Sequence, residues 1–399
     1  MNRSHIVTAA ALLLVGAALP AHAGSPTCQG AGEHLMSWPE GNPVWEFCWV
    51  RPADSSGPSG SGLEIRDAYY RGTLVFKRAH APMLNVDYDP GGCGCFRDWL
   101  HSEHTYRTDN EVSPGYLEPA FPAETVCDHA VDPLSPPGDC PWGGPGPCLN
   151  GVSAEFFTDH VRLTSQADAG WYRYSLRWEF YDDGTVLPTF GFGTYNTSCA
   201  GATHRHHVYW RLDFDIDDAG NDTVSQVGGS LPGPVAQEAE RTWEEGGVTW
   251  EVRDSATGRG YRLTPGTQDR LLPIDAFSKN DLMVTLYHPN EFSDSGGGCA
   301  INPGSLVNGE AVADTDVVMY YRGGVRDVVG VDIHQCKVAG PTLTPLGEWG
   351  VFEGFTDGFE SGDTSAWSAT VPSRLKNEER RPKNGQGVRP SAPSQSLIG

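Results

Sequence analysis

The chain has 399 residues, of which 51 are acidic and 28 basic, giving a formal net charge of −23. This balance excludes nucleic-acid binding as the expected function, because a phosphate backbone is held by an excess of Lys and Arg. The negative charge is compatible with a cationic small substrate, and also with simple solubility of an exported protein.

The first 23 residues predict a signal peptide. A basic Arg3 precedes an apolar stretch over 6–19, and the segment 21–23 (AHA) has the small-x-small pattern of a cleavage site. No other run reaches the ~18 apolar residues of a spanning helix. We therefore expect a secreted or periplasmic protein without a membrane span.

Short alternating segments separated by turn residues predict an all-β domain over 24–352. Asp182-Asp183-Gly184 has the composition of a hairpin turn. The polar stretch 353–399 predicts a flexible linker and tail, since it has too little apolar surface to order itself. The expected strands are 63–70, 72–78, 171–181, 205–217, 248–253, 282–287 and 316–322.

Ten cysteines all lie after residue 23, and an even number in an exported chain favours disulfides over metal thiolates. Their pairing cannot be read from the sequence. They stand at positions 28, 48, 93, 95, 127, 140, 148, 199, 299 and 336.

The segment 204–217 (HRHHVYWRLDFDID) predicts a strand with two distinct faces. With a period of two, His204 and His206 share an apolar face, where two imidazoles could bind one metal ion or cap a core edge by hydrogen bonding. Asp213, Asp215 and Asp217 share the opposite face. They indicate either a calcium site or a solvated edge strand.

Several motifs together resemble the catalytic domain of the copper-containing amine oxidases, which carry a self-made topaquinone. The pair His204 and His206 stands seven and five residues before Arg-Leu-Asp at 211–213, as in that family. The resemblance extends in patches over about 41–350, through 45–72, 281–291 (DLMVTLYHPNE), 313–325 (ADTDVVMYYRGGV) and 340–347 (GPTLTPLG). It implies a large antiparallel β-sandwich of the catalytic-domain type.

The same resemblance implies the residues of a quinone site. Tyr172 stands at the topaquinone precursor position, with Trp171 where the family has Asn and Arg173 where it has an acid. The segment 87–99 implies Asp98 as the catalytic base. Within that segment the resemblance makes Tyr88 the channel tyrosine and Phe96 the aromatic gate, in a spacing four residues shorter than the family's.

Two metal sites follow from the resemblance. Copper would be held by His204 and His206, with Asp327 where the family has its third histidine. His207, His288 and His334 are reserve candidates. The implied calcium ligands are the side chains of Asp213, Asp215 and Asp316 and the backbone carbonyl of Val317.

The implied function is oxidation of primary amines to aldehyde, ammonia and hydrogen peroxide, with copper, topaquinone and calcium as cofactors. The family also implies a homodimer. The alternative that we retain is a non-catalytic sandwich of the same fold, which binds calcium and another divalent metal.

Overall fold

The computed structural model describes most of the chain between residues 24 and 350. The described residues are 24–58, 60–89, 93–102, 106–107, 137–138, 148–149, 152–169, 172–194, 199, 202–241, 248–266, 269, 281–293, 302–327 and 337–350. The predicted signal peptide (1–23) and the predicted tail (353–399) lie outside them. No described helix is long and apolar enough to cross a membrane.

The first sheet is antiparallel and contains the strand with the two histidines. Its order is β1-β2-β3-β4-β13-β20-β19-β16, with β5 paired to β4. The bounds are β1 Glu33–Trp38, β2 Trp45–Val50, β3 Glu64–Tyr70, β4 Thr73–Tyr88, β5 Cys95–Asp98, β13 His204–Phe214, β16 Ala239–Arg241, β19 Leu282–Leu286 and β20 Val317–Asp327.

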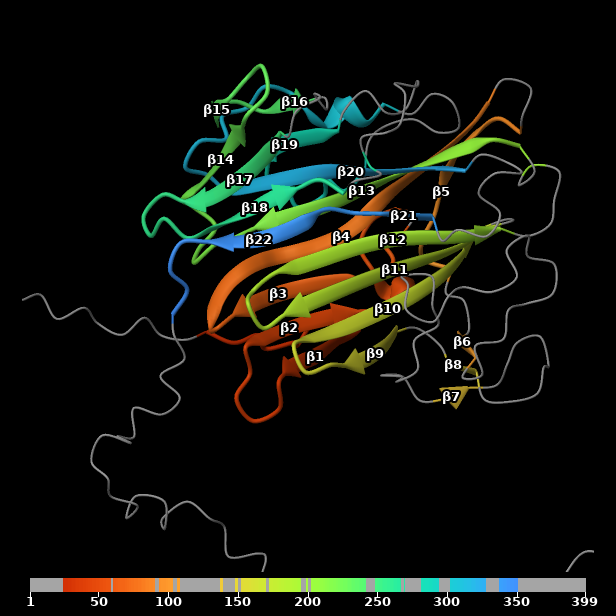
Figure 1. The fold of residues 1–399 in the computed structure, drawn as a ribbon, viewed down its shortest axis with the longest axis horizontal. Coiled ribbons are helices and arrows are strands. Elements are labelled where there is room, and N and C mark those ends of the chain that lie inside the picture. The colour runs from red at the N-terminus through yellow and green to blue at the C-terminus, as the bar shows by residue number, and fades with distance from the viewer. Residues whose placement is uncertain are drawn as a thin grey trace, which may run out of the picture. The chain divides into compact units, whose positions relative to one another are not determined.

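The second sheet is also antiparallel and lies over the first (Figure 1). Its order is β15-β14-β17-β18-β22-β12-β11-β10-β9, with β21 paired to β12. The bounds are β9 Val152–Phe156, β10 His160–Ala169, β11 Tyr172–Tyr181, β12 Val186–Thr194, β14 Asp222–Val227, β15 Gly233–Val235, β17 Thr249–Asp254, β18 Gly260–Thr264, β21 Lys337–Ala339 and β22 Thr342–Leu346.

One minor sheet and two short helices complete the described structure. A minor sheet pairs β6 (Tyr106–Arg107), β8 (Cys148–Leu149) and β7 (Pro137–Gly138). Two short 3-10 helices, η1 (Pro52–Asp54) and η3 (Pro303–Leu306), are the helical segments of the described part of the chain.

One hydrophobic core fills the space between the two large sheets. Trp178 of β11 meets Trp210 of β13 edge to face, with ring centroids 5.2 Å apart, and both side chains are fully buried. Such aromatic pairs add directional contact to the burial of large apolar surfaces. The predicted all-β sandwich is therefore confirmed.

The expected strands are all present, and two are longer than predicted. The strand expected over 72–78 continues to Tyr88 as β4, and the one expected over 316–322 continues to Asp327 as β20. The predicted turn also forms, since the Gly184 amide donates to the Tyr181 carbonyl at 3.0 Å. Gly184 has φ of +89°, a value that glycine adopts without steric cost.

The prediction of a solvated edge strand at 204–217 is wrong. β13 pairs with β4 on one side and β20 on the other, and all its residues are buried. A second apolar cluster covers its outer face, formed by Met83, Tyr209, Met283, Leu306, Val318 and Tyr320. The prediction that Asp213, Asp215 and Asp217 share one face of this strand is also wrong. The strand ends at Phe214, and Asp217 turns away with φ of +65°.

Disulfides form as the cysteine count predicts. Cys28 pairs with Cys48, and Cys93 pairs with Cys199. Cys95 is also disulfide-bonded. The Cys93–Cys199 bond lies at the end of the sandwich where the candidate site is found.

Candidate functional site

Two facing strands bring the predicted site residues together between the sheets. β13 places His204 and His206 on its inner face, and β11 of the opposite sheet places Tyr172 against them. The centroid of the Tyr172 ring lies 5.3 Å from that of His204 and 4.6 Å from that of His206, and the two imidazole centroids are 5.2 Å apart. All three side chains are buried, so the phenol and the imidazoles share one water-poor space.

The backbone fixes the tautomer of His204. Its Nδ1 lies 2.7 Å from the carbonyl oxygen of Ala202, which can only accept a hydrogen bond. Nδ1 therefore carries the proton and Nε2 carries the lone pair. A ring oriented by a backbone carbonyl in this way is typical of metal-ligating histidines.

The hydrogen bonds of Tyr174 assign the tautomer of His206. The Tyr174 hydroxyl donates to Asp98, so its oxygen is left to accept from His206 Nε2 at 3.2 Å. Nδ1 of His206 is buried and has no hydrogen-bond partner among the described residues. Burial, with smaller contributions from His204 and His207, keeps its pKa well below the usual range, so the ring is neutral and can ligate a metal.

Tyr88 holds the phenol of Tyr172. The two hydroxyl groups share a hydrogen bond of 2.7 Å, and Tyr88 stands opposite His204 in the β4–β13 register. The ring of Phe96 stands edge-on to Tyr88, with centroids 6.1 Å apart. The predicted channel tyrosine and aromatic gate thus lie beside the predicted quinone precursor.

Asp98 enters the same site from β5. Burial raises its pKa to about 6, although the hydrogen bond from Tyr174 acts in the opposite direction. A carboxylate with this pKa is mostly ionised at neutral pH, yet basic enough to take a proton from a substrate. The shorter spacing of the segment 87–99 still brings Asp98 to the site, because β5 folds back antiparallel onto β4.

Sequence reasoning missed Tyr174, which connects the candidate base to a candidate metal ligand. It is fully buried and its ring stacks with that of Tyr172 at 5.6 Å. A signal was present, since residues two apart on a strand share a face and Tyr174 follows Tyr172 by two.

The remaining copper candidates lie in different environments. The backbone of Asp327 stands opposite His204 in the β13–β20 register, while its carboxylate lies outside the described side chains. His207 faces away, where its Nδ1 accepts a hydrogen bond from Arg322 at 3.1 Å. His288 pairs with Glu310 at 2.7 Å. His334, Trp171 and the side chain of Arg173 lie outside the described residues.

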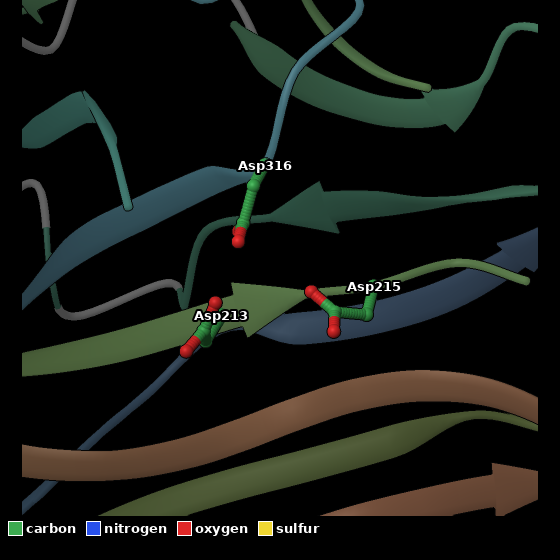
Figure 2. A group of neighbouring side chains, drawn as sticks. All are labelled: Asp213, Asp215 and Asp316. Atoms are coloured by element: carbon green, nitrogen blue, oxygen red, sulfur yellow. The ribbon is translucent and has the colours of Figure 1, made fainter. Parts of the chain in front are cut away.

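Three carboxylates form a separate cluster near the end of β13 (Figure 2). Asp213, Asp215 and Asp316 each offer an oxygen, and these oxygens lie within 4.8 Å of one another. Burial and mutual repulsion raise the pKa of Asp215 to about 8, and burial with Asp213 raises that of Asp316 to about 7. Val317 follows Asp316 directly and pairs with Phe214.

The cluster fits a hard divalent cation. One oxygen of each carboxylate is buried without a hydrogen-bond partner among the described residues, although Arg211 donates to the other oxygen of Asp213 at 3.1 Å. Calcium takes several carboxylate and carbonyl oxygens in flexible geometry. The residues that the resemblance assigned to calcium are therefore brought together.

Asp222 is a further buried acid that sequence reasoning missed. It is fully buried and forms a β-bridge with Thr315, the neighbour of Asp316. Burial is the main cause that raises its pKa to about 9. A hydrogen bond from the Ile216 amide lowers this pKa, while Asp215 and the other nearby acids raise it. Asp222 belongs to no recognisable motif, so the sequence gives no signal that it is buried beside the carboxylate cluster.

Solved structures show the same architecture. A copper-containing benzylamine oxidase from Hansenula polymorpha is similar with a TM-score of 0.56 and 14% identity, over 79% of this chain and 61% of that one. A lysyl oxidase from Pichia pastoris is similar with a TM-score of 0.50 and 14% identity, over 76% of this chain and 51% of that one. The chain has the fold of the copper-containing amine oxidases.

The likeness is one of fold, and it covers about half to three-fifths of the length of those oxidases. No family profile matches the sequence, and no curated protein matches it. At 14% identity the likeness shows the fold alone.

Proposed function

We propose that this chain is an exported oxidase of primary amines that uses copper and a topaquinone derived from Tyr172. The observation that carries the proposal is the position of the Tyr172 ring, which lies against both imidazoles and is hydrogen-bonded to Tyr88. A phenol in that position would lie next to a metal ion held by the two imidazoles, which its oxidation would require. The amine oxidase fold and the raised pKa of Asp98 support the same reading.

Copper would be held by His204 and His206, with Asp327 as the third ligand. The first two residues fit, because a hydrogen bond at one nitrogen of each ring leaves the other nitrogen as the lone-pair donor, and burial keeps the pKa of His206 low. The backbone register brings Asp327 opposite His204. A set of two imidazoles and one carboxylate is harder and less selective for copper than three imidazoles.

Each neighbouring side chain has a defined task in this proposal. The topaquinone would supply the electron sink for converting an amine, dioxygen and water to aldehyde, ammonia and hydrogen peroxide. Asp98 takes the α-proton of the substrate, while Tyr88 orients the ring at position 172. Phe96 stands beside Tyr88 as the gate to the site.

Calcium would be held by the carboxylates of Asp213, Asp215 and Asp316 and the carbonyl of Val317. The geometry of the three side chains supports this assignment. Asp213 shares the strand parity of Tyr209, on the face of β13 opposite to His204 and His206. Its role in the proposal is structural, because it would neutralise three acids that repel one another.

The second candidate is a non-catalytic sandwich that binds calcium and another divalent metal. The carboxylate cluster favours it, since this cluster forms without Tyr172. The substitutions Trp171 and Arg173 beside the precursor position favour it as well.

A redox-cycling quinone stain on copper-loaded, oxygenated protein separates the two candidates. We expect the wild type to stain and Tyr172→Phe not to stain. Tyr181→Phe, at the other end of β11, is the matched control and should stain like the wild type. A wild-type protein that contains bound copper and gives no stain would reject the oxidase and leave the binding protein.

Export and self-association complete the proposal. The disulfides Cys28–Cys48 and Cys93–Cys199 are compatible with a secreted or periplasmic protein. A homodimer is proposed from the fold relationship, and light scattering of the purified chain tests it.

A further inference from the structure

A disulfide and a candidate metal ligand are connected through one turn of the backbone. Cys199 follows β12 and Cys93 lies between β4 and β5, so their bond joins the entry to β13 with the hairpin that carries Phe96 and Asp98. The two cysteines are 106 residues apart in sequence. Both pack against the main core at the site end of the sandwich, as Phe96 and Ala202 do.

Hydrogen bonds lead from this disulfide to the imidazole of His204. The Ala202 amide donates to the carbonyl of Cys199 at 3.0 Å. The carbonyl of Ala202 in turn accepts the Nδ1 proton of His204 at 2.7 Å. The Asp89 amide donates to Thr203 at 2.9 Å, which holds the last residue before the strand. The carbonyl that fixes the tautomer of His204 is thus part of a turn anchored by Cys199.

We propose that the Cys93–Cys199 disulfide is a positioning element of the metal site, acting through the Ala202 carbonyl on His204. The inference rests on the proposed metal role of His204. A carbonyl bonded to the second ring nitrogen sets both the orientation and the donor strength of a ligating histidine. Without the bond, Ala202 keeps only its backbone contacts, and the imidazole is held less firmly for the metal.

The test compares two double variants of the full chain, each lacking one disulfide. Cys93→Ser/Cys199→Ser should bind Cu²⁺ about tenfold more weakly than wild type, the lower end of the effect of disturbing the group that hydrogen-bonds a ligating histidine. The electron paramagnetic resonance spectrum of its bound Cu²⁺ should also change. Cys28→Ser/Cys48→Ser removes a bond between the N-terminal segment and β2, and should keep both the affinity and the spectrum of the wild type.

A second measurement needs no variant and therefore does not depend on the folding of one. A water-soluble phosphine reduces a disulfide to two thiols and is itself oxidised to the phosphine oxide, with the oxygen taken from water. Zn²⁺ is the probe, because it is not redox-active. Zn²⁺ should slow reduction of Cys93–Cys199 and leave Cys28–Cys48 unaffected, as read by alkylation and peptide mass spectrometry.

The outcomes distinguish the inference from the function on which it rests. Wild-type protein that binds neither Cu²⁺ nor Zn²⁺ would overturn the metal site itself. Binding by the wild type with equal affinity and an unchanged spectrum in Cys93→Ser/Cys199→Ser would overturn the inference alone. Equal reduction rates for Cys93–Cys199 with and without Zn²⁺ would do the same.

Discussion

Tyr174 links the candidate base to a candidate metal ligand through one hydroxyl group. It donates to Asp98 and receives the Nε2 proton of His206. The first hydrogen bond stabilises the ionised carboxylate, and the second fixes the free nitrogen of the imidazole. A single phenol therefore influences both the proton acceptor and the metal site.

The pH dependence of kcat/KM should report Asp98. Only the ionised carboxylate accepts a proton, so kcat/KM for a primary amine should rise through a pKa of about 6. Asp98→Asn should lower kcat/KM by ~10²–10⁴-fold. Tyr174→Phe removes a hydrogen bond that lowers this pKa, so the acid limb should move to higher pH.

Tyr181→Phe is the control for that shift and should keep the wild-type profile. An acid limb that stays in place in Tyr174→Phe would show that a group other than Asp98 controls the rate.

Part of the site could be anticipated residue by residue, and part could not. The pairing of His204 with His206 follows from the strand period, while Tyr172, Asp98 and Tyr88 were assigned through the family resemblance. The geometry places these side chains together, and their chemical roles stay predictions. Asp222 was missed because its importance comes from neighbours on other strands, which a local pattern does not contain. For Tyr174 the strand period predicts only that it shares a face with Tyr172, whereas its partners Asp98 and His206 lie on other strands.

The strands facing each other across the core give the site its rigidity. β11 and β13 belong to different sheets, and their aromatic side chains meet in the middle. Trp178 is fully buried and its Nε1 donates to the Leu63 carbonyl at 3.2 Å. The site at one end of these strands is therefore supported by large rings along their length.

Removing one of these rings should be costly. Trp178→Ala should lower the free energy of unfolding by about 3–5 kcal/mol, because a large buried side chain leaves a cavity. Trp99→Ala is the control, since Trp99 is 42% exposed, and should change stability by less than about 0.5 kcal/mol. Urea denaturation measures both, and equal losses in the two variants would contradict the packing argument.

Some strand positions were readable from the sequence, whereas the remaining strands and the environment of β13 were not. Alternation and turn residues located seven strands, because a period of two is local. The sequence pattern of β13 predicted that its charged face is solvated. In the structure, Tyr209 on that face is covered by residues about 70 to 130 positions away in sequence. Coverage by distant segments depends on tertiary packing, and no strand pattern records it.

Across the whole molecule, an excess of acid is concentrated in one buried cluster as well as spread over the surface. The chain has a net charge of −23, and Asp213, Asp215 and Asp316 lie together near the end of β13. The pKa values of Asp215 and Asp316 are raised to about 8 and about 7. Both values exceed the ~4 of aspartate in an unfolded chain.

Calcium-free protein should therefore lose thermal stability as the pH rises. The folded state binds these protons more tightly than the unfolded state, so their contribution is full below pH ~4 and is lost as the pH passes through about 7 to 8. Ca²⁺ binds the ionised carboxylates, so its stabilising effect should grow over the same range. The melting temperature with Ca²⁺ or with a chelator, followed against pH, measures this.

Asp215→Asn should remove most of the calcium effect, and Asp217→Asn should retain it, since Asp217 turns away and pairs with Arg259. A melting temperature that is independent of Ca²⁺ at pH 8 in the wild type would reject the site.

The burial of β13 on both faces limits how solvent and ions can reach this strand. Amide protons of a central strand covered on both sides exchange with solvent only when the molecule opens as a whole. An ion that binds His204 and His206 would therefore have to enter at the end of β13 that carries them, and not through a transient gap in the sheet. By the same logic, heating should destroy the candidate site and the sandwich in a single transition.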